Sequence, residues 1–100
     1  MKARTVSFYI GPEFVPQVLD ALDNELIPQY REVPHFIGLV VLESEEEGRP
    51  EFLGMSVWDG DRTDCDDVID TFLTRLFDVA GTSATTRRYN VVRLIAADRM

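Results

Sequence analysis

Apolar and polar residues alternate near the start of the chain, over Thr5-Val6-Ser7-Phe8-Tyr9-Ile10. A period of two is typical of a strand with one buried face, and Gly11-Pro12 marks its end. From about Glu13 to Tyr30 the apolar residues instead recur every three or four positions, which predicts an amphipathic helix. Pro28 lies near the end of that helix, where its missing N–H predicts a kink or a terminus. Val33-Pro34 then breaks the helical pattern.

Two nearly continuous apolar runs follow, at residues 35–42 and 51–58. Such runs predict strands that bury side chains on both faces. The acidic stretch 43–50 between them is expected to form a solvated hairpin loop. A last strand is predicted over residues 88–95, after a small polar loop at residues 82–86.

A second helix is predicted from about Thr63 to Ala80, with an apolar stripe that includes Phe72. Thr63 and Asp66 have the spacing of an N-terminal capping box. Gly81 is a natural residue to end the helix, because glycine adopts a positive φ most easily.

The order strand, helix, strand, strand, helix, strand predicts an α+β, ferredoxin-like βαββαβ fold. Right-handed crossovers would place both helices on one face of a four-stranded antiparallel sheet and leave the other face open. The two apolar strands would then expose a large apolar patch, formed by Ile37, Leu39, Val41, Leu53, Met55 and Val57 or by the alternate set. Patches of this kind usually mark interfaces, so we expect a homodimer through the open sheet face.

Composition limits the classes of partner. The 100 residues, 11.4 kDa, are expected to form one domain, residues 1–100. Eighteen acidic against ten basic residues give a net charge of −8, which argues against nucleic acid and anionic membranes as partners. The single cysteine, Cys65, cannot form an internal disulfide, and no apolar run is long enough to span a bilayer. These features predict a cytoplasmic protein.

Two short motifs resemble the antibiotic-biosynthesis-monooxygenase-like domain of the dimeric α+β barrel superfamily. They are Pro34-His35-Phe36-Ile37-Gly38, before and within the second strand, and Met55-Ser56-Val57-Trp58-Asp59, closing the third. The resemblance covers residues 5 to about 95 and implies pairing of two ferredoxin-like units into a dimeric barrel. Where the family has Pro-Gly-Phe, this chain has Pro34-His35-Phe36.

The resemblance implies a pocket between sheet and helices that Trp58 lines, with Ser56 and Gly54 on the same strand face. Family members that form quinones orient the substrate with an amide on this face, whereas this strand offers only a hydroxyl and a hydrogen. The alternative interpretation of Trp58 is a core aromatic residue with one N–H donor.

His35 is the only histidine, and imidazole is the side chain that exchanges a proton most readily near neutral pH. It could deprotonate a phenolic substrate, so His35 and Trp58 are the candidate catalytic residues. The alternative is an exposed histidine at the start of a strand. One histidine without a second His or Cys nearby does not match a transition-metal site, so no metal is expected.

Further candidates for substrate binding are polar residues on predicted strands, together with one helix residue. Buried polar side chains need hydrogen-bond partners, which a ligand or a second subunit could supply. The candidates are Ser7, Tyr9, Ser56 and Asn90, with Phe72 from the second helix.

Haem degradation is argued against by two departures from the haem-degrading relatives. The second helix has no histidine, and the first strand has no asparagine. No cofactor is therefore expected. The leading hypothesis is a small cofactor-independent monooxygenase that acts on an aromatic or polyketide-type substrate in an apolar pocket. The alternative is a non-catalytic dimeric module that binds a small apolar ligand or acts as a scaffold. A pocket of about 300 Å³ or more with converging polar groups such as His35 or Tyr9 would favour the enzyme, and a filled core the module.

Overall fold

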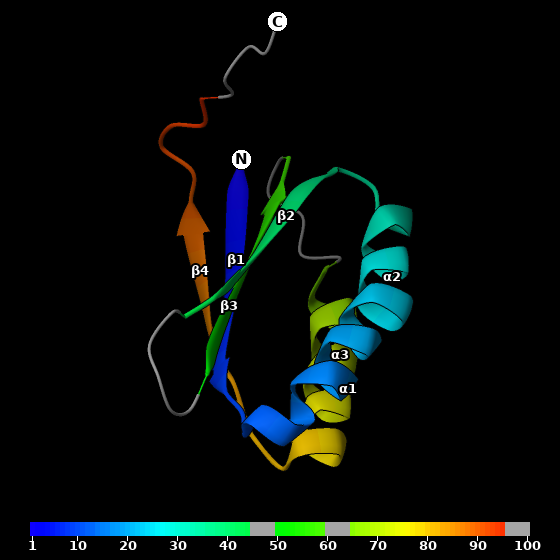
Figure 1. Ribbon diagram of the computed structural model, residues 1–100. Coiled ribbons are helices and arrows are strands. Elements are labelled where there is room, and N and C mark those ends of the chain that lie inside the picture. The colour runs from blue at the N-terminus through cyan, green and yellow to red at the C-terminus, as the bar shows by residue number, and fades with distance from the viewer. Residues whose placement is uncertain (45–49, 60–64, 96–100) are drawn as a thin grey trace, which may run out of the picture.

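A computed structural model describes residues 1–44, 50–59 and 65–95, with Cys65 described by its backbone only. Four strands form one antiparallel sheet in the order β2-β3-β1-β4 (Figure 1). Their bounds are β1 Lys2–Tyr9, β2 Phe36–Glu43, β3 Glu51–Trp58 and β4 Thr85–Asn90. The expected α+β ferredoxin-like fold is confirmed.

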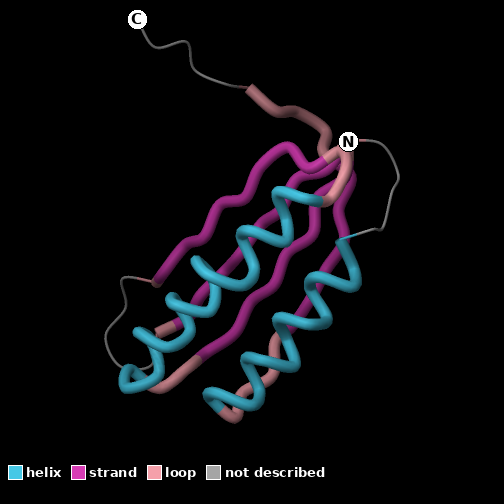
Figure 2. The backbone as a smooth tube through the Cα atoms, turned by 90° about the vertical axis from the view of Figure 1, so that its right-hand side faces the viewer, coloured by secondary structure: helices cyan, strands magenta, loops and turns pink. Residues whose placement is uncertain are grey.

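The helices form one layer over one face of this sheet, as Figure 2 shows. The first helical run consists of η1 (Pro12–Phe14), α1 (Val15–Ala21), η2 (Leu22–Leu26) and α2 (Ile27–Glu32). The second helix is α3 (Cys65–Ala80), and Gly81 after it has φ +64° and donates its N–H to the Phe77 carbonyl. The expected glycine terminus is confirmed, whereas Thr63 of the expected capping box lies outside the described residues.

A π-helical turn replaces the kink or terminus expected at Pro28. In this turn, Leu22–Leu26, the N–H of Ile27 reaches back five residues to the carbonyl of Leu22. Proline within an α-helix lacks one donor, and its ring presses on the carbonyl four residues earlier, here that of Asn24. Widening the helix just before Pro28 relieves that crowding, so the helix continues to Glu32.

The first strand begins three residues earlier than the alternation indicated, at Lys2. Its even-numbered residues face the helices, because Val6 and Phe8 are buried in the common core. The same alternation places Arg4 on the helix-facing side of the sheet.

The last strand was predicted at residues 88–95, which is wrong in position. The strand lies at Thr85–Asn90, so Thr85 and Thr86 of the expected polar loop belong to it. Its ladder partner β1 starts at Lys2, paired with Asn90, and the N–H of Val91 bonds the carbonyl of Met1. Beyond that point no neighbouring strand remains in the described chain, so residues 92–95 have no strand to pair with there.

A β-bulge decides which residues of β2 face the helices. The register moves from Phe36 opposite Trp58 to Gly38 opposite Val57, so one extra residue is inserted. Leu39 and Val41 therefore face the helices, while Val40 and Leu42 face the open side.

The residues expected from sequence to form one exposed apolar patch are thus divided between the two faces of the sheet. Leu39 and Val41 of that set do not belong to the open face, which is a correction. Met55 and Val57 do belong to it. Large apolar side chains that are exposed on the sheet include Tyr9, Ile37, Val40, Leu42, Met55 and Tyr89.

The main core lies between the sheet and the helices. Its central members are Ile10, Phe52, Ile69 and Leu76, all nearly inaccessible to solvent. No helix of the described residues is long and apolar enough to cross a membrane.

Candidate functional site

A small apolar cavity of about 30 Å³ lies between the sheet and the helices. Val6, Gly54 and Val41 line it from neighbouring strands, and Leu22 and Leu26 line it from the π-helical turn. Three lining residues carry polar groups, namely Arg4, Tyr30 and Ser56. A space of this size holds about one water molecule, so the core is nearly filled in this conformation.

A surface groove of about 250 Å³ adjoins the cavity between α2 and β2. Tyr30, Leu39 and Val41 line both spaces. Because β2 is an edge strand, these side chains separate the cavity from solvent on that side. The groove is therefore one route from solvent toward the cavity.

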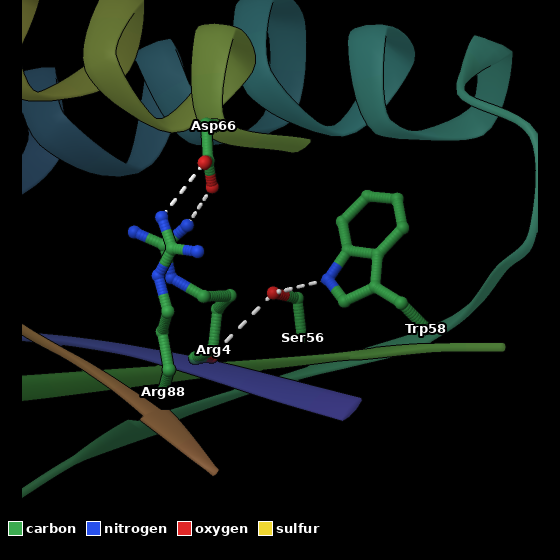
Figure 3. Close-up of polar contacts among 5 residues, drawn as sticks. All are labelled: Arg4, Ser56, Trp58, Asp66 and Arg88. Carbon is green, nitrogen blue, oxygen red and sulfur yellow. Dashed lines mark hydrogen bonds and ion pairs between the residues drawn. The ribbon is translucent and has the colours of Figure 1, made fainter. Parts of the chain in front are cut away.

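Ser56 provides the hydroxyl group of the cavity wall. Ser56 and Trp58 are each 2% exposed, and the indole Nε1–H of Trp58 donates to Ser56 Oγ at 2.9 Å. The hydroxyl in turn donates to the backbone carbonyl of Arg4 at 3.4 Å (Figure 3). Both partners of this side-chain pair are thus satisfied inside the core.

An aromatic cluster packs around the Trp58 indole. The ring centroids of Trp58 and Tyr30 are 5.3 Å apart, edge to face, and those of Trp58 and Phe36 are 5.1 Å apart. Tyr30 and Phe36 stack at 5.4 Å. These contacts fix the orientation of the indole, and Trp58 itself is not among the cavity-lining residues.

An ionic cluster borders the same cavity on the α3 side. Asp66, in the first turn of α3, accepts from the Arg4 guanidinium on one carboxylate oxygen. Its other oxygen accepts from Arg88 Nη2 of β4 at 2.8 Å. Figure 3 shows both guanidinium groups pointing toward the single carboxylate. The cluster thus joins β1, β4 and α3 across the sheet–helix boundary.

The candidates proposed from sequence are distributed over different parts of the molecule. Ser56 and Phe72 line the cavity. Ser7 and Tyr9 lie on the open face of the sheet, and Asn90 accepts from Lys2 Nζ at the end of β4. The structure therefore groups Ser56, Phe72 and Trp58 on the helix-facing side of the sheet, while Ser7, Tyr9 and Asn90 line one hollow on its open side.

His35 lies in the exposed turn before β2 and is not a cavity-lining residue. Its φ is +70°, and its carbonyl accepts the N–H of Asp59 at 2.8 Å. The turn needs a residue in the left-handed region, where the resembled family has glycine. The position of His35 is thus explained by the backbone, with the imidazole at the surface.

Sequence reasoning missed Arg4, the charged residue of the cavity wall. The signal was present, because Arg4 continues the even-numbered, core-facing alternation of Val6, Phe8 and Ile10. A charged residue at a core-facing strand position is uncommon and usually needs a partner. Asp66, interpreted from sequence as a helix cap, is that partner.

In the described part of the chain, no three His, Cys, Asp or Glu side chains are grouped so that they could hold a metal ion. No protein-family model matches this sequence, and no curated protein sequence matches it.

Solved structures, in contrast, match over nearly the whole chain. A monooxygenase of Streptomyces coelicolor, solved with nanaomycin D bound, is 12% identical with a TM-score of 0.69, covering 97% of this chain and 92% of its own. SnoaB, a cofactor-independent oxygenase of Streptomyces nogalater, is 12% identical with a TM-score of 0.63. That match covers 96% of this chain and 98% of SnoaB. Proteins described as antibiotic biosynthesis monooxygenases, at 16–19% identity, share this fold as well.

Two further matches limit what this likeness implies. A dimeric ferredoxin-like protein from an uncultured marine organism has a TM-score of 0.72 at 15% identity, covering 97% of this chain and all of its own. A de novo designed protein, Ferredog-Diesel, also matches, with a TM-score of 0.58 at 10% identity over 85% of this chain and 83% of its own. Because a designed protein shares the fold, activity has to be argued from the site.

Proposed function

We propose that this protein is a homodimeric, cofactor-independent monooxygenase-type enzyme that acts on an aromatic or polyketide-type substrate. The observation that carries the proposal is the apolar cavity between sheet and helices, with Ser56 and Arg4 in its wall. Two proteins of the same fold, described as a monooxygenase and a cofactor-independent oxygenase, support it.

The proposed reaction converts an activated CH₂ group of a phenolic ring system into a carbonyl. The substrate loses a proton, its carbanion reacts with O₂, and one oxygen atom stays in the product while the other leaves as water. The chemistry resides in the substrate anion, so the protein contributes orientation and an apolar environment. Leu22, Leu26 and Phe72 would supply that environment.

Substrate binding requires the cavity to open. Its volume of about 30 Å³ is far below the range of roughly 300–1,000 Å³ that small-molecule sites occupy. The adjoining groove offers about 250 Å³, and the side chains between the two spaces are Tyr30, Leu39 and Val41. Movement of Tyr30 and the rest of α2 away from Leu39 and Val41 of β2 would join the two spaces.

The open face of the sheet supports the homodimer. Val40, Leu42 and Met55 are exposed side by side on β2 and β3, and a hollow of about 780 Å³ extends over β3, β1 and β4. A second copy of the chain would cover this apolar face by a two-fold symmetric contact. The likeness to a protein described as a dimeric ferredoxin-like protein favours this partner over an unrelated one.

A second candidate function is a non-catalytic dimeric module that binds a small apolar ligand. The nearly filled cavity favours it, as does the chemistry of β3, whose cavity-facing residues Gly54 and Ser56 offer no amide. In this alternative His35 would have no role in proton transfer, in agreement with its position in the exposed turn.

Oxygen consumption with 1,8-dihydroxyanthrone as the probe separates the two candidates. The enzyme predicts O₂ uptake above the spontaneous rate, matched by anthraquinone formation and unaffected by EDTA. The module predicts a change in the fluorescence of Trp58, the sole tryptophan, without extra O₂ uptake. If neither signal changes for this probe or for related hydroxylated naphthalenes, both candidates fail.

A further inference from the structure

We propose that Arg4 makes the cavity selective for aromatic ligands that carry a negatively charged oxygen. The inference deepens the proposed function and rests on it, because it assumes that the cavity accepts an aromatic ligand. It names the class of ligand, an aryl carboxylate or phenolate, and the residue that selects it.

The first observation is the burial of a permanent charge beside an apolar space. The Arg4 side chain is only 11% exposed and lines the cavity together with Val6, Leu22 and Ser56. Removing a guanidinium from water is costly unless an anion compensates it. A residue of this kind is therefore retained only where its charge is balanced or used.

The second observation is that Arg4 shares its counter-ion with a second arginine. Among the described residues, the Asp66 carboxylate faces two guanidinium groups, those of Arg4 and Arg88. Arg88 is 60% exposed, so water also compensates its charge, whereas Arg4 depends on Asp66. One carboxylate thus serves both guanidinium groups, and Arg4, the more buried of the two, has less compensation from water than Arg88.

The third observation is a donor without an acceptor. Arg4 Nε is shielded from solvent and has no hydrogen-bond partner, the only side-chain nitrogen or oxygen so placed in the described chain. Ser56 is already engaged, since its Oγ accepts from Trp58 and donates to the Arg4 carbonyl. Once the cavity opens, as substrate binding requires, a ligand oxygen that reaches Arg4 Nε would supply the missing acceptor.

The expected effect is a preference for an anion over a neutral molecule of the same shape. Hydrogen bonds between charged groups are stronger than neutral ones, and the surrounding apolar side chains screen the charge poorly. We therefore expect about a tenfold or greater difference in affinity.

Titration of the protein with 2-naphthoate and with 2-naphthamide at pH 7, followed by Trp58 fluorescence, tests the proposal. The indole is bonded to Ser56 in the cavity wall, so occupancy should change its emission. The native protein should bind 2-naphthoate about tenfold or more tightly than 2-naphthamide. Arg4→Met should abolish this preference, while binding of the amide persists.

Arg88→Met is the matched control, because it removes the other guanidinium on Asp66 and leaves Arg4 in the cavity wall. It should retain the preference for 2-naphthoate. Equal affinity of the native protein for both probes would overturn the role of Arg4 even if the Arg4→Met variant failed to fold. A preference that survives Arg4→Met would overturn it as well. If neither probe nor any other aromatic compound binds, the proposed function itself fails.

Discussion

The indole Nε1–H of Trp58, the only hydrogen-bond donor of that side chain, donates to the Ser56 hydroxyl at 2.9 Å. Ser56 lies two residues earlier on the same face of β3. Both side chains are buried, and β1 pairs with β3 opposite each of them. The pair therefore stabilises the core and positions a hydroxyl in the cavity wall at the same time.

Replacing Ser56 with alanine should lower the free energy of unfolding by about 1–3 kcal/mol, because the buried indole N–H loses its acceptor. Urea denaturation followed by far-UV circular dichroism measures this loss. Trp58→Phe and the double variant complete a double-mutant cycle, with an expected coupling of about 0.5–1.5 kcal/mol. If the two substitutions had additive effects on the free energy of unfolding, the hydrogen bond between Trp58 and Ser56 would not contribute to stability.

His35→Gly should stabilise the protein by about 0.5–1 kcal/mol. A left-handed conformation costs a non-glycine residue roughly 1–2 kcal/mol, partly offset by the greater freedom of glycine in the unfolded chain. Thermal unfolding measures the change, and His35→Ala serves as the control because it removes the imidazole without relieving the backbone. If His35→Ala stabilised the protein as much as His35→Gly, the gain in stability would come from loss of the imidazole and not from the relaxed backbone.

The order of elements could be predicted from periodicity, because each element buries one stripe or face. The residues at which the elements begin and end could be predicted less accurately than their order. The strand predicted at 88–95 lies at Thr85–Asn90, since the extent of a strand depends on where its neighbour lies. Val92 and Leu94 are apolar, which shows only that their side chains favour burial. Both are nevertheless exposed in this chain.

The candidate site was only partly predictable. Phe72 was found because it falls on the apolar stripe of α3, and Ser56 because it shares a strand face with Trp58 in the motif that carries the family resemblance. The bulge after Phe36, which turns Leu39 and Val41 toward the cavity, leaves no mark in the apolar run of β2. A shift of one residue exchanges the two faces of a strand, so periodicity alone could not assign them.

Met55→Asp should convert the proposed dimer into a monomer without unfolding the chain. Met55 is 39% exposed in the centre of the open face, where a second copy would have to bury the new carboxylate. Sedimentation velocity at micromolar concentration measures the change. Phe77→Asp is the matched control, since Phe77 is 60% exposed on α3, away from the sheet. A native protein that is monomeric, or a Met55→Asp variant that remains dimeric, would exclude this interface.

Gly54→Val should fill the cavity. A Cβ atom at Gly54 would meet only the Val6 carbonyl oxygen, at 4.0 Å, so the added methyl groups can occupy the space of about 30 Å³ beside it. We expect a gain of about 1 kcal/mol in the free energy of unfolding, because valine favours a strand, together with loss of 2-naphthoate binding. Gly38→Val is the control: it makes the same exchange on the opposite face of the sheet, with no atom within 4 Å of the new Cβ, and should leave binding intact. If Gly54→Val is stabilised but still binds 2-naphthoate with native affinity, the ligand lies outside this cavity.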